Sequence, residues 1–216
     1  MGTLFNECIR QVRDIYERFD ASHDFDHILR VMKNAEDIAA TLPEADLSII
    51  RLAALLHDID DPKYAELSSL SAEEVMQRAG MEKETIVQVL TIIQSVSFNG
   101  GNEKAITSIE GAVVRDADRL DAIGAIGIAR TFAFGGARGR KLYDTQEISR
   151  SEMTEEEYRS KETASVTHFY EKLLLLKELM VTDEGKRLAA QRHAFMVAFL
   201  TQLEEETGSS FQPKSL

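Results

Sequence analysis

The sequence contains one cysteine, three prolines and no tryptophan among its 216 residues. The single thiol, Cys8, excludes an internal disulfide and fits a reducing compartment, so we expect a cytoplasmic protein. The first ten residues lack an apolar stretch behind a basic flank, and no apolar run approaches the ~18 residues of a membrane span. We therefore expect neither a signal peptide nor a transmembrane helix.

Positive charge is also scarce, because 25 Lys and Arg face 37 Asp and Glu, for a formal net charge of -12. Such a chain is not drawn by its overall field to nucleic acid or to an anionic membrane, and we expect neither as a partner. A polyanionic substrate would need a bound cation or a local basic pocket. At 44% hydrophobic residues, the chain can bury a substantial core.

The shortage of proline and the absence of sustained apolar–polar alternation predict an all-α protein. With no repeat and no evident linker, we expect one domain over residues 1–216. Capping boxes at Ser71 and Thr154 each predict a helix start. The predicted helices cover residues 3–19, 24–42, 47–58, 71–79, 83–96, 108–134, 154–180 and 183–206, with a turn at 99–102.

Charged residues interrupt two strongly apolar segments. The helix over 47–58 is apolar nearly all round, which predicts a central position, yet it ends in His57 and Asp58. A buried carboxylate must be ion-paired, hydrogen-bonded or bound to metal. His27 lies in the first turn of the helix over 24–42, and Asp118 lies on the apolar segment 108–134. The same segment contains glycines at 124 and 127, which usually mark close approach by another backbone.

Two imidazoles and two carboxylates form a mixed nitrogen–oxygen set that suits Mn, Fe, Co, Ni or Zn better than Ca or Mg. The residues alone leave a second interpretation open. Asp58 and Asp118 could be helix-terminal or ion-paired acids, and His27 could be a core histidine.

The order His27, His57-Asp58 and Asp118-Arg119-Leu120 resembles the H…HD…D signature of the HD-domain metal-dependent phosphohydrolases. The resemblance covers about residues 20–135 and implies an HD-type helical bundle whose central apolar helices carry the metal ligands, followed by C-terminal helices over about 154–206. The segments 22–27 and 116–127 more narrowly resemble the small stand-alone bacterial HD hydrolases, some of which are nucleoside triphosphate pyrophosphohydrolases.

The resemblance implies that one divalent ion is bound by His27, His57, Asp58 and Asp118. We favour Mn, with Co, Ni, Fe, Zn or Mg as alternatives. Asp121 lies three residues after Asp118 and could orient a ligand or a water, although a surface acid is as plausible.

Two residues are predicted to handle protons. Asp61 follows the His-Asp pair by three positions and could act as an acid or base, or be a plain loop acid. Some relatives carry an acidic pair here, whereas this chain has Pro62 in the second position, which counts against a ppGpp-hydrolase mechanism. His23 could protonate a leaving group or hold a phosphate, or it could cap a helix.

Cationic residues are the candidate substrate contacts, with surface positions or core ion pairs as the alternative for each. A glycine-rich basic stretch after residue 134 could form a lid. The predicted substrate-binding residues are Lys63, Arg119, Arg138, Arg140, His168 and Lys172.

We expect a metal-dependent phosphohydrolase acting on a small phosphorylated metabolite, with a nucleoside triphosphate cleaved to monophosphate and pyrophosphate as the favoured reaction. The alternatives are a nucleotidase or other phosphomonoesterase, a ppGpp-type hydrolase, and a non-catalytic HD module that senses metal or nucleotide. A monomer and a homodimer are both compatible with the sequence.

Overall fold

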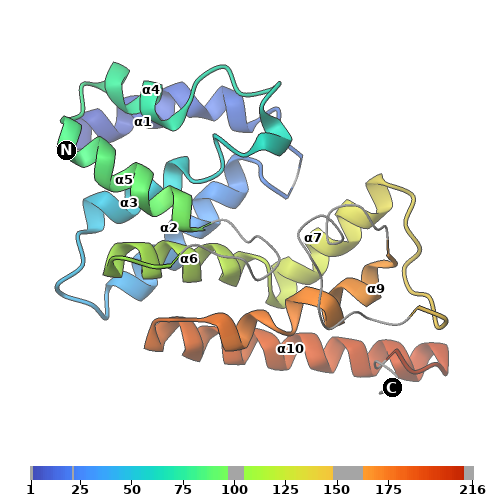
Figure 1. The fold of residues 1–216 in the computed structure, drawn as a ribbon. Coiled ribbons are helices and arrows are strands. Elements are labelled where there is room, and N and C mark those ends of the chain that lie inside the picture. The colour runs from blue at the N-terminus through green and yellow to red at the C-terminus, as the bar shows by residue number, and fades with distance from the viewer. Residues whose placement is uncertain (1, 21, 97–104, 148–162, 212–216) are drawn as a thin grey trace. The chain divides into compact units, whose positions relative to one another are not determined.

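The structure, a computed structural model, describes residues 2–20, 22–96, 105–147 and 163–211. Every regular element in these ranges is a helix, which confirms the all-α prediction (Figure 1). The chain forms two compact units, and the division falls within one helix, between residues 118 and 119. The single domain expected from the sequence stays a prediction, and each unit is described by itself.

The first unit contains the N-terminal helices and most of α6. Its elements are α1 (Gly2–Tyr16), α2 (Phe25–Ala39), α3 (Leu47–Leu56), the 3-10 turn η1 (Pro62–Tyr64), α4 (Ala72–Ala79), α5 (Lys83–Val96) and the larger part of α6 (Ile109–Asp121).

Helix α3 is the centre of the first unit, as its apolar sequence predicts. Residues 52–56 are completely buried, and the helix packs against α2 and α5 (Figure 1). Full burial of a leucine side chain contributes roughly 1.5–3 kcal/mol, so α3 supplies much of the stability of this unit. Asp46 caps its N-terminus, and the hydroxyl of Tyr16 donates to the carbonyl of Leu55 at 2.8 Å.

Local sequence signals position α4 and α5 correctly. Ser71 and Glu74 form the predicted capping box, and Gly80 ends α4 with a φ of 81°, a left-handed conformation that favours glycine. Helix α5 spans the predicted residues.

Helix α6 is tied into the first unit by hydrogen bonds to residues distant in sequence. The side chain of Asn34 in α2 donates to the carbonyl of Ala117 at 3.1 Å, and Arg115 donates to the carbonyl of Ser95 at 2.8 Å. The four residues that form these two bonds are all buried. These bonds fix the rotation of α6, and therefore the direction in which Asp118 projects.

The second unit packs α7 (Gly124–Ala137) against α10 (Asp183–Thr207). Between them in sequence lie α9 (Ser165–His168), the π-helical turn η2 (Phe169–Leu173) and the 3-10 turn η3 (Leu176–Leu179). An aromatic cluster of Phe132, Phe169 and Phe199, with ring centroids 5.8–6.0 Å apart, joins these elements.

The continuous helix predicted over 108–134 is wrong, because the chain breaks between Asp121 and Gly124. Ile123 is extended, and Gly124 has a φ of 74° with the side chain of Arg192 against its bare face. A Cβ on Gly127 would lie 2.2 Å from the carbonyl oxygen of Ala122, so the turn after the break requires glycine there too. The expected close approach by backbone is therefore found at Gly127.

The helix predicted to run from 154 to 180 is also wrong over its described part, which consists of the short α9, η2 and η3. Its first half, with the capping box at Thr154, and the turn at 99–102 lie outside the described residues. In the part of the chain that the structure describes, no single helix is long and apolar enough to cross a membrane, although α6 and α7 taken together across their bend meet that test of length and composition.

Candidate metal centre

Three helices of the first unit position the four predicted ligands. His27 lies in the first turn of α2, where its backbone N–H donates to the capping carboxylate of Asp24 at 2.8 Å. His57 is the C-cap of α3, and Asp58 follows it where the backbone leaves the helix, so the two adjacent side chains converge. Asp118 projects from α6.

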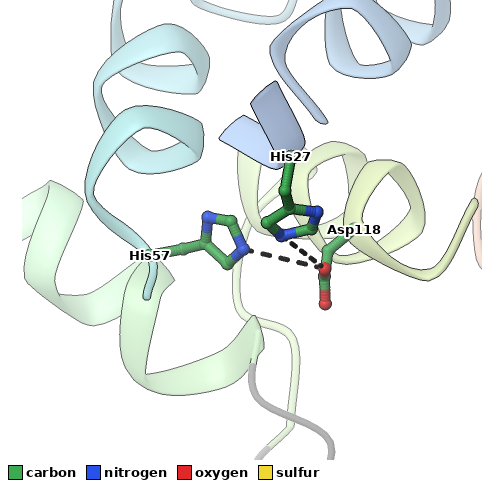
Figure 2. A group of neighbouring side chains, drawn as sticks. All are labelled: His27, His57 and Asp118. Carbon is green, nitrogen blue, oxygen red and sulfur yellow. Dashed lines mark ion pairs between the residues drawn. The ribbon is translucent and has the colours of Figure 1, made fainter. Parts of the chain in front are cut away.

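The four side chains lie close together, and His27, His57 and Asp118 form a cluster that could hold a metal ion. Nε2 of His27 and Nε2 of His57 each lie 3.3 Å from Oδ2 of Asp58. Oδ1 of Asp118 lies 3.6 Å from Nε2 of His27 and 3.7 Å from Nε2 of His57 (Figure 2). Ligand atoms about 2.0–2.2 Å from a shared ion are roughly 3.0–3.5 Å apart in tetrahedral or octahedral geometry. The observed spacing is therefore close to that of a coordinated set.

The polar atoms of this cluster also fit a cation. Nε2 of His57 and Oδ2 of Asp58 are buried and form no hydrogen bond within the described ranges. Nδ1 of His57 lies 2.9 Å from the carbonyl of Ala54, an arrangement that keeps the proton on Nδ1 and leaves the lone pair of Nε2 for a metal. Buried polar atoms of this kind are costly unless an ion or a proton compensates them.

The electrostatics show how protons compensate when no ion is bound. Burial by itself would lower the pKa of His57, but the carboxylates of Asp58 and Asp118 outweigh it and raise the pKa to about 9. Burial likewise opposes ionisation of Asp58 and Asp118, yet the two neighbouring imidazoles, His57 first, hold the pKa of both carboxyls below their usual range. A divalent cation would replace the imidazolium proton as the compensating charge.

The predicted proton-handling residues lie in the same unit. The His23 ring packs edge-on against the His27 ring at 5.6 Å between centroids, so it borders the metal cluster. Asp61 caps η1, accepting the backbone N–H of Lys63 at 2.8 Å. The ammonium of Lys63 donates to the hydroxyl of Tyr64 at 2.6 Å. That hydroxyl also lies 2.9 Å from Nδ1 of His23, so the ammonium of Lys63 lies close to His23.

Asp121 and Arg119 belong to the second unit. Asp121 is 1% exposed and pairs with Arg130 at 2.6 Å, so it is a buried acid and the surface alternative is wrong. Arg119 is 4% exposed, and its guanidinium donates to the carbonyl of Leu179. The parts proposed for these residues in binding metal or substrate stay predictions.

The other predicted substrate contacts also belong to the second unit. The guanidinium groups of Arg138 and Arg140 lie 3.5 and 5.2 Å from the ring centroid of Phe134. Burial, reinforced by the nearby charges of Lys172 and Arg140, lowers the pKa of His168 to about 3. The lowered pKa keeps the imidazole of His168 neutral at physiological pH.

Two residues around His23 were missed by the sequence analysis. Asp20 lies 3.7 Å from Nδ1 of His23, and the hydroxyl of Tyr64 lies 2.9 Å from the same nitrogen. The run of polar residues between the first two helices was a usable signal for Asp20. Tyr64 is 41 residues from His23 and had no local signal.

Comparison with known proteins agrees with this geometry. The HD domain family model matches residues 24–123, a range that contains all four predicted ligands. The uncharacterized protein YpgQ of Bacillus subtilis is 41% identical over 203 residues, covering 90% of this chain and 89% of its own length.

Three solved structures are closely similar. A Lactobacillus plantarum protein has a TM-score of 0.85 at 35% identity, covering 96% of this chain and 98% of its own. YpgQ in complex with ADP has a TM-score of 0.75 at 37% identity, covering 94% of each chain. An HD-superfamily hydrolase of Bacillus thuringiensis has a TM-score of 0.71 at 38% identity, covering 95% and 97%.

Proposed function

The chain belongs to the HD-domain superfamily of hydrolases, and on that premise we propose that it is a metal-dependent phosphohydrolase whose substrate is a nucleotide. The observation that carries the proposal is the convergence of two imidazoles and two carboxylates, with buried Nε2 and Oδ2 atoms facing a common point. The ADP bound to YpgQ supports a nucleotide as the ligand class.

We propose a single divalent ion, with Mn favoured, held by His27, His57, Asp58 and Asp118. When bound, such an ion supplies a lowered pKa for a water molecule and polarises a phosphoryl oxygen. The mixed nitrogen–oxygen set favours a first-row transition metal over Ca or Mg.

The favoured reaction is hydrolysis of a nucleoside triphosphate to monophosphate and pyrophosphate. The oxygen of water bonds to the α-phosphorus, and the bond from that phosphorus to the bridging oxygen breaks. Asp61 takes the proton that the water loses, and His23, when both its ring nitrogens carry a proton, gives the proton of Nε2 to the departing pyrophosphate. Lys63 contacts the phosphates as a point charge.

The test is a release assay over a panel of nucleoside tri-, di- and monophosphates and ppGpp, in Mn, Co, Ni, Zn or Mg. Phosphate and pyrophosphate are measured for the wild type, for Asp58→Asn and for Asp37→Asn. Asp37 is an exposed acid of α2 paired with Lys33, so its variant is a matched control that leaves the cluster intact.

Pyrophosphate released from triphosphates by the wild type and by Asp37→Asn, but not by Asp58→Asn, is the expected result. Phosphate released from monophosphates would replace the proposal with a nucleotidase. No release from any nucleotide, with metal bound in the wild type and lost in Asp58→Asn, would favour a sensing module.

A further inference from the structure

We propose that Tyr64 is a positioning residue which, together with Ser22 and Asp20, holds the imidazole of His23 in one orientation and one tautomer, with the proton on Nδ1 and Nε2 presented to the substrate. The orientation and the tautomer follow from the contacts of these residues. The presentation to a phosphorylated substrate rests on the proposed function.

Tyr64 is placed rigidly enough to orient a neighbour. It is 4% exposed, and its ring stacks on Phe19 with 4.0 Å between centroids and 12° between planes. Its hydroxyl lies 2.9 Å from Nδ1 of His23, and the two rings are 5.4 Å apart. Because a buried tyrosine ring stacked on Phe19 keeps its hydroxyl in place, the position of Nδ1 is restrained as well.

The donors and acceptors determine which nitrogen of His23 carries the proton. The hydroxyl of Ser22 has one hydrogen, which it donates to Asp20, so at 2.8 Å from Nδ1 its oxygen acts as an acceptor. The hydroxyl of Tyr64 accepts from the ammonium of Lys63 at 2.6 Å, and its second lone pair can accept from the N–H of Nδ1. The hydroxyl oxygens of Ser22 and Tyr64 can therefore both accept a hydrogen bond from His23, which requires a proton on Nδ1.

Asp20 completes the arrangement as the charged end of the chain of bonds. Its carboxylate accepts the backbone N–H of Ser22 at 3.0 Å and the ammonium of Lys63 at 3.2 Å. The contact with His23, followed by those with Ser22 and Lys63, holds the pKa of Asp20 well below its usual range. Because Asp20 stays ionised and lies on the Nδ1 side of the His23 ring, its negative charge favours a proton on Nδ1 over one on Nε2.

The consequence for His23 is that Nδ1 is occupied and Nε2 is the nitrogen available to another molecule. No hydrogen bond to Nε2 of His23 occurs within the described ranges, and the ring lies against His27 of the metal cluster. An isolated histidine side chain prefers the opposite tautomer, so the network imposes a choice that the residue would not make alone.

The first experiment measures the tautomer directly, without reference to activity. Long-range ¹H–¹⁵N spectra of uniformly labelled protein at pH 8 separate a protonated from an unprotonated ring nitrogen, and His23→Gln identifies the His23 signals among those of five histidines. We expect a protonated Nδ1 in the wild type and a shift toward protonated Nε2 in Tyr64→Phe. The control Tyr143→Phe removes a hydroxyl from the second unit and should leave His23 unchanged.

The second experiment uses the phosphohydrolase activity in a double-mutant cycle. Tyr64→Phe should lower kcat about tenfold or more with little change in KM or in bound Mn, because misplaced catalytic groups cost up to ~100-fold. The same substitution should have almost no further effect in a His23→Gln background.

A His23 tautomer that is the same in the wild type and in Tyr64→Phe would overturn the proposal, as would an equal loss of kcat in both backgrounds. If no phosphorylated substrate is turned over, the proposed function fails. The NMR comparison still decides whether Tyr64 positions His23.

Discussion

In the absence of metal, the first unit should lose stability as the pH rises from 6.5 to 8.5, because folding must then return to His57 a proton that the unfolded chain no longer holds. The folded pKa of His57 is about 9, above its ordinary value of 6.5. A raised folded pKa means that the proton stabilises the fold fully below pH 6.5, and that this contribution disappears as the pH rises through about 9. Proton linkage gives a contribution of about 3 kcal/mol at pH 6.5 and about 1 kcal/mol at pH 8.5, a loss of about 2 kcal/mol.

Four other groups with shifted pKa values change the stability little, or equally in the wild type and the variants, over this pH range. The pKa values of Asp58 and Asp118 are lowered, so both carboxyls stay ionised throughout the window. The pKa of Cys8 is raised by burial to about 11, so ionisation of the unfolded thiol adds a loss of only a few tenths of a kcal/mol near pH 8.5, which the wild type and any variant at Asp58 share. The pKa of His168 is lowered to about 3, and its small effect near pH 6.5 is common to the wild type and to any variant of the first unit.

The assay is urea unfolding in EDTA at pH 6.5, 7.5 and 8.5, with Asp58→Asn as the matched control. Without the Asp58 charge, the largest cause that raises the pKa of His57 is removed, so the variant should show a smaller slope. Saturating Mn should also remove the slope, because a coordinated imidazole is already neutral. A wild-type unfolding free energy that is constant over the window, or a slope shared by Asp58→Asn, would refute the reasoning.

Three further predictions concern single positions. Asp118→Ala removes a proposed ligand and should weaken Mn binding by more than about 100-fold, measured by calorimetry. Loss of a residue that only hydrogen-bonds a metal ligand already costs ~10–100-fold in affinity. Unchanged affinity would show that the ion does not use Asp118. Gly127→Ala should destabilise the protein by about 2 kcal/mol or more in thermal unfolding, because its Cβ would lie 2.2 Å from the carbonyl oxygen of Ala122, whereas Gly136→Ala meets no atom within 4 Å and should stabilise by up to ~1 kcal/mol. Ser71→Ala removes the cap of α4 and should cost ~1 kcal/mol in urea unfolding, and an unchanged midpoint would mean that α4 does not need its capping box.

Where local chemistry decides the structure, the sequence was sufficient. The capping box at Ser71 and the glycine at position 80 mark the two ends of α4 as predicted. The apolar pattern of α3 predicted its central position, and residues 52–56 are completely buried. The order His27, His57-Asp58 and Asp118 predicted the four side chains that converge, because a buried charge at the end of an apolar helix needs compensation.

Where distant contacts decide, local pattern was insufficient. The apolar periodicity continues through Ile123, and glycine is merely unfavourable in a helix, so nothing local required a break between α6 and α7. Gly124 has a positive φ, and the side chain of Arg192, 68 residues later in the sequence, packs where a Cβ of residue 124 would lie. The same is true of Tyr64, whose contact with His23 joins segments that no local spacing relates.

The anchoring of α6 has a consequence for how the first unit is held together. Asn34 and Ala117, whose hydrogen bond fixes α6 beside α2, are 83 residues apart in sequence, and the two proposed ligands His27 and Asp118 flank that span. A chain with one cysteine has no disulfide to close such a loop, and an ion bound by these residues would join the two ends of the span. An ion that binds only the folded first unit stabilises it by about 2.7 kcal/mol when its free concentration is about 100 times the dissociation constant. Metal starvation would then expose the first unit to proteolysis, as reduction of its disulfides exposes a secreted protein. The second unit contributes none of the four proposed ligands and would not lose stability in this way.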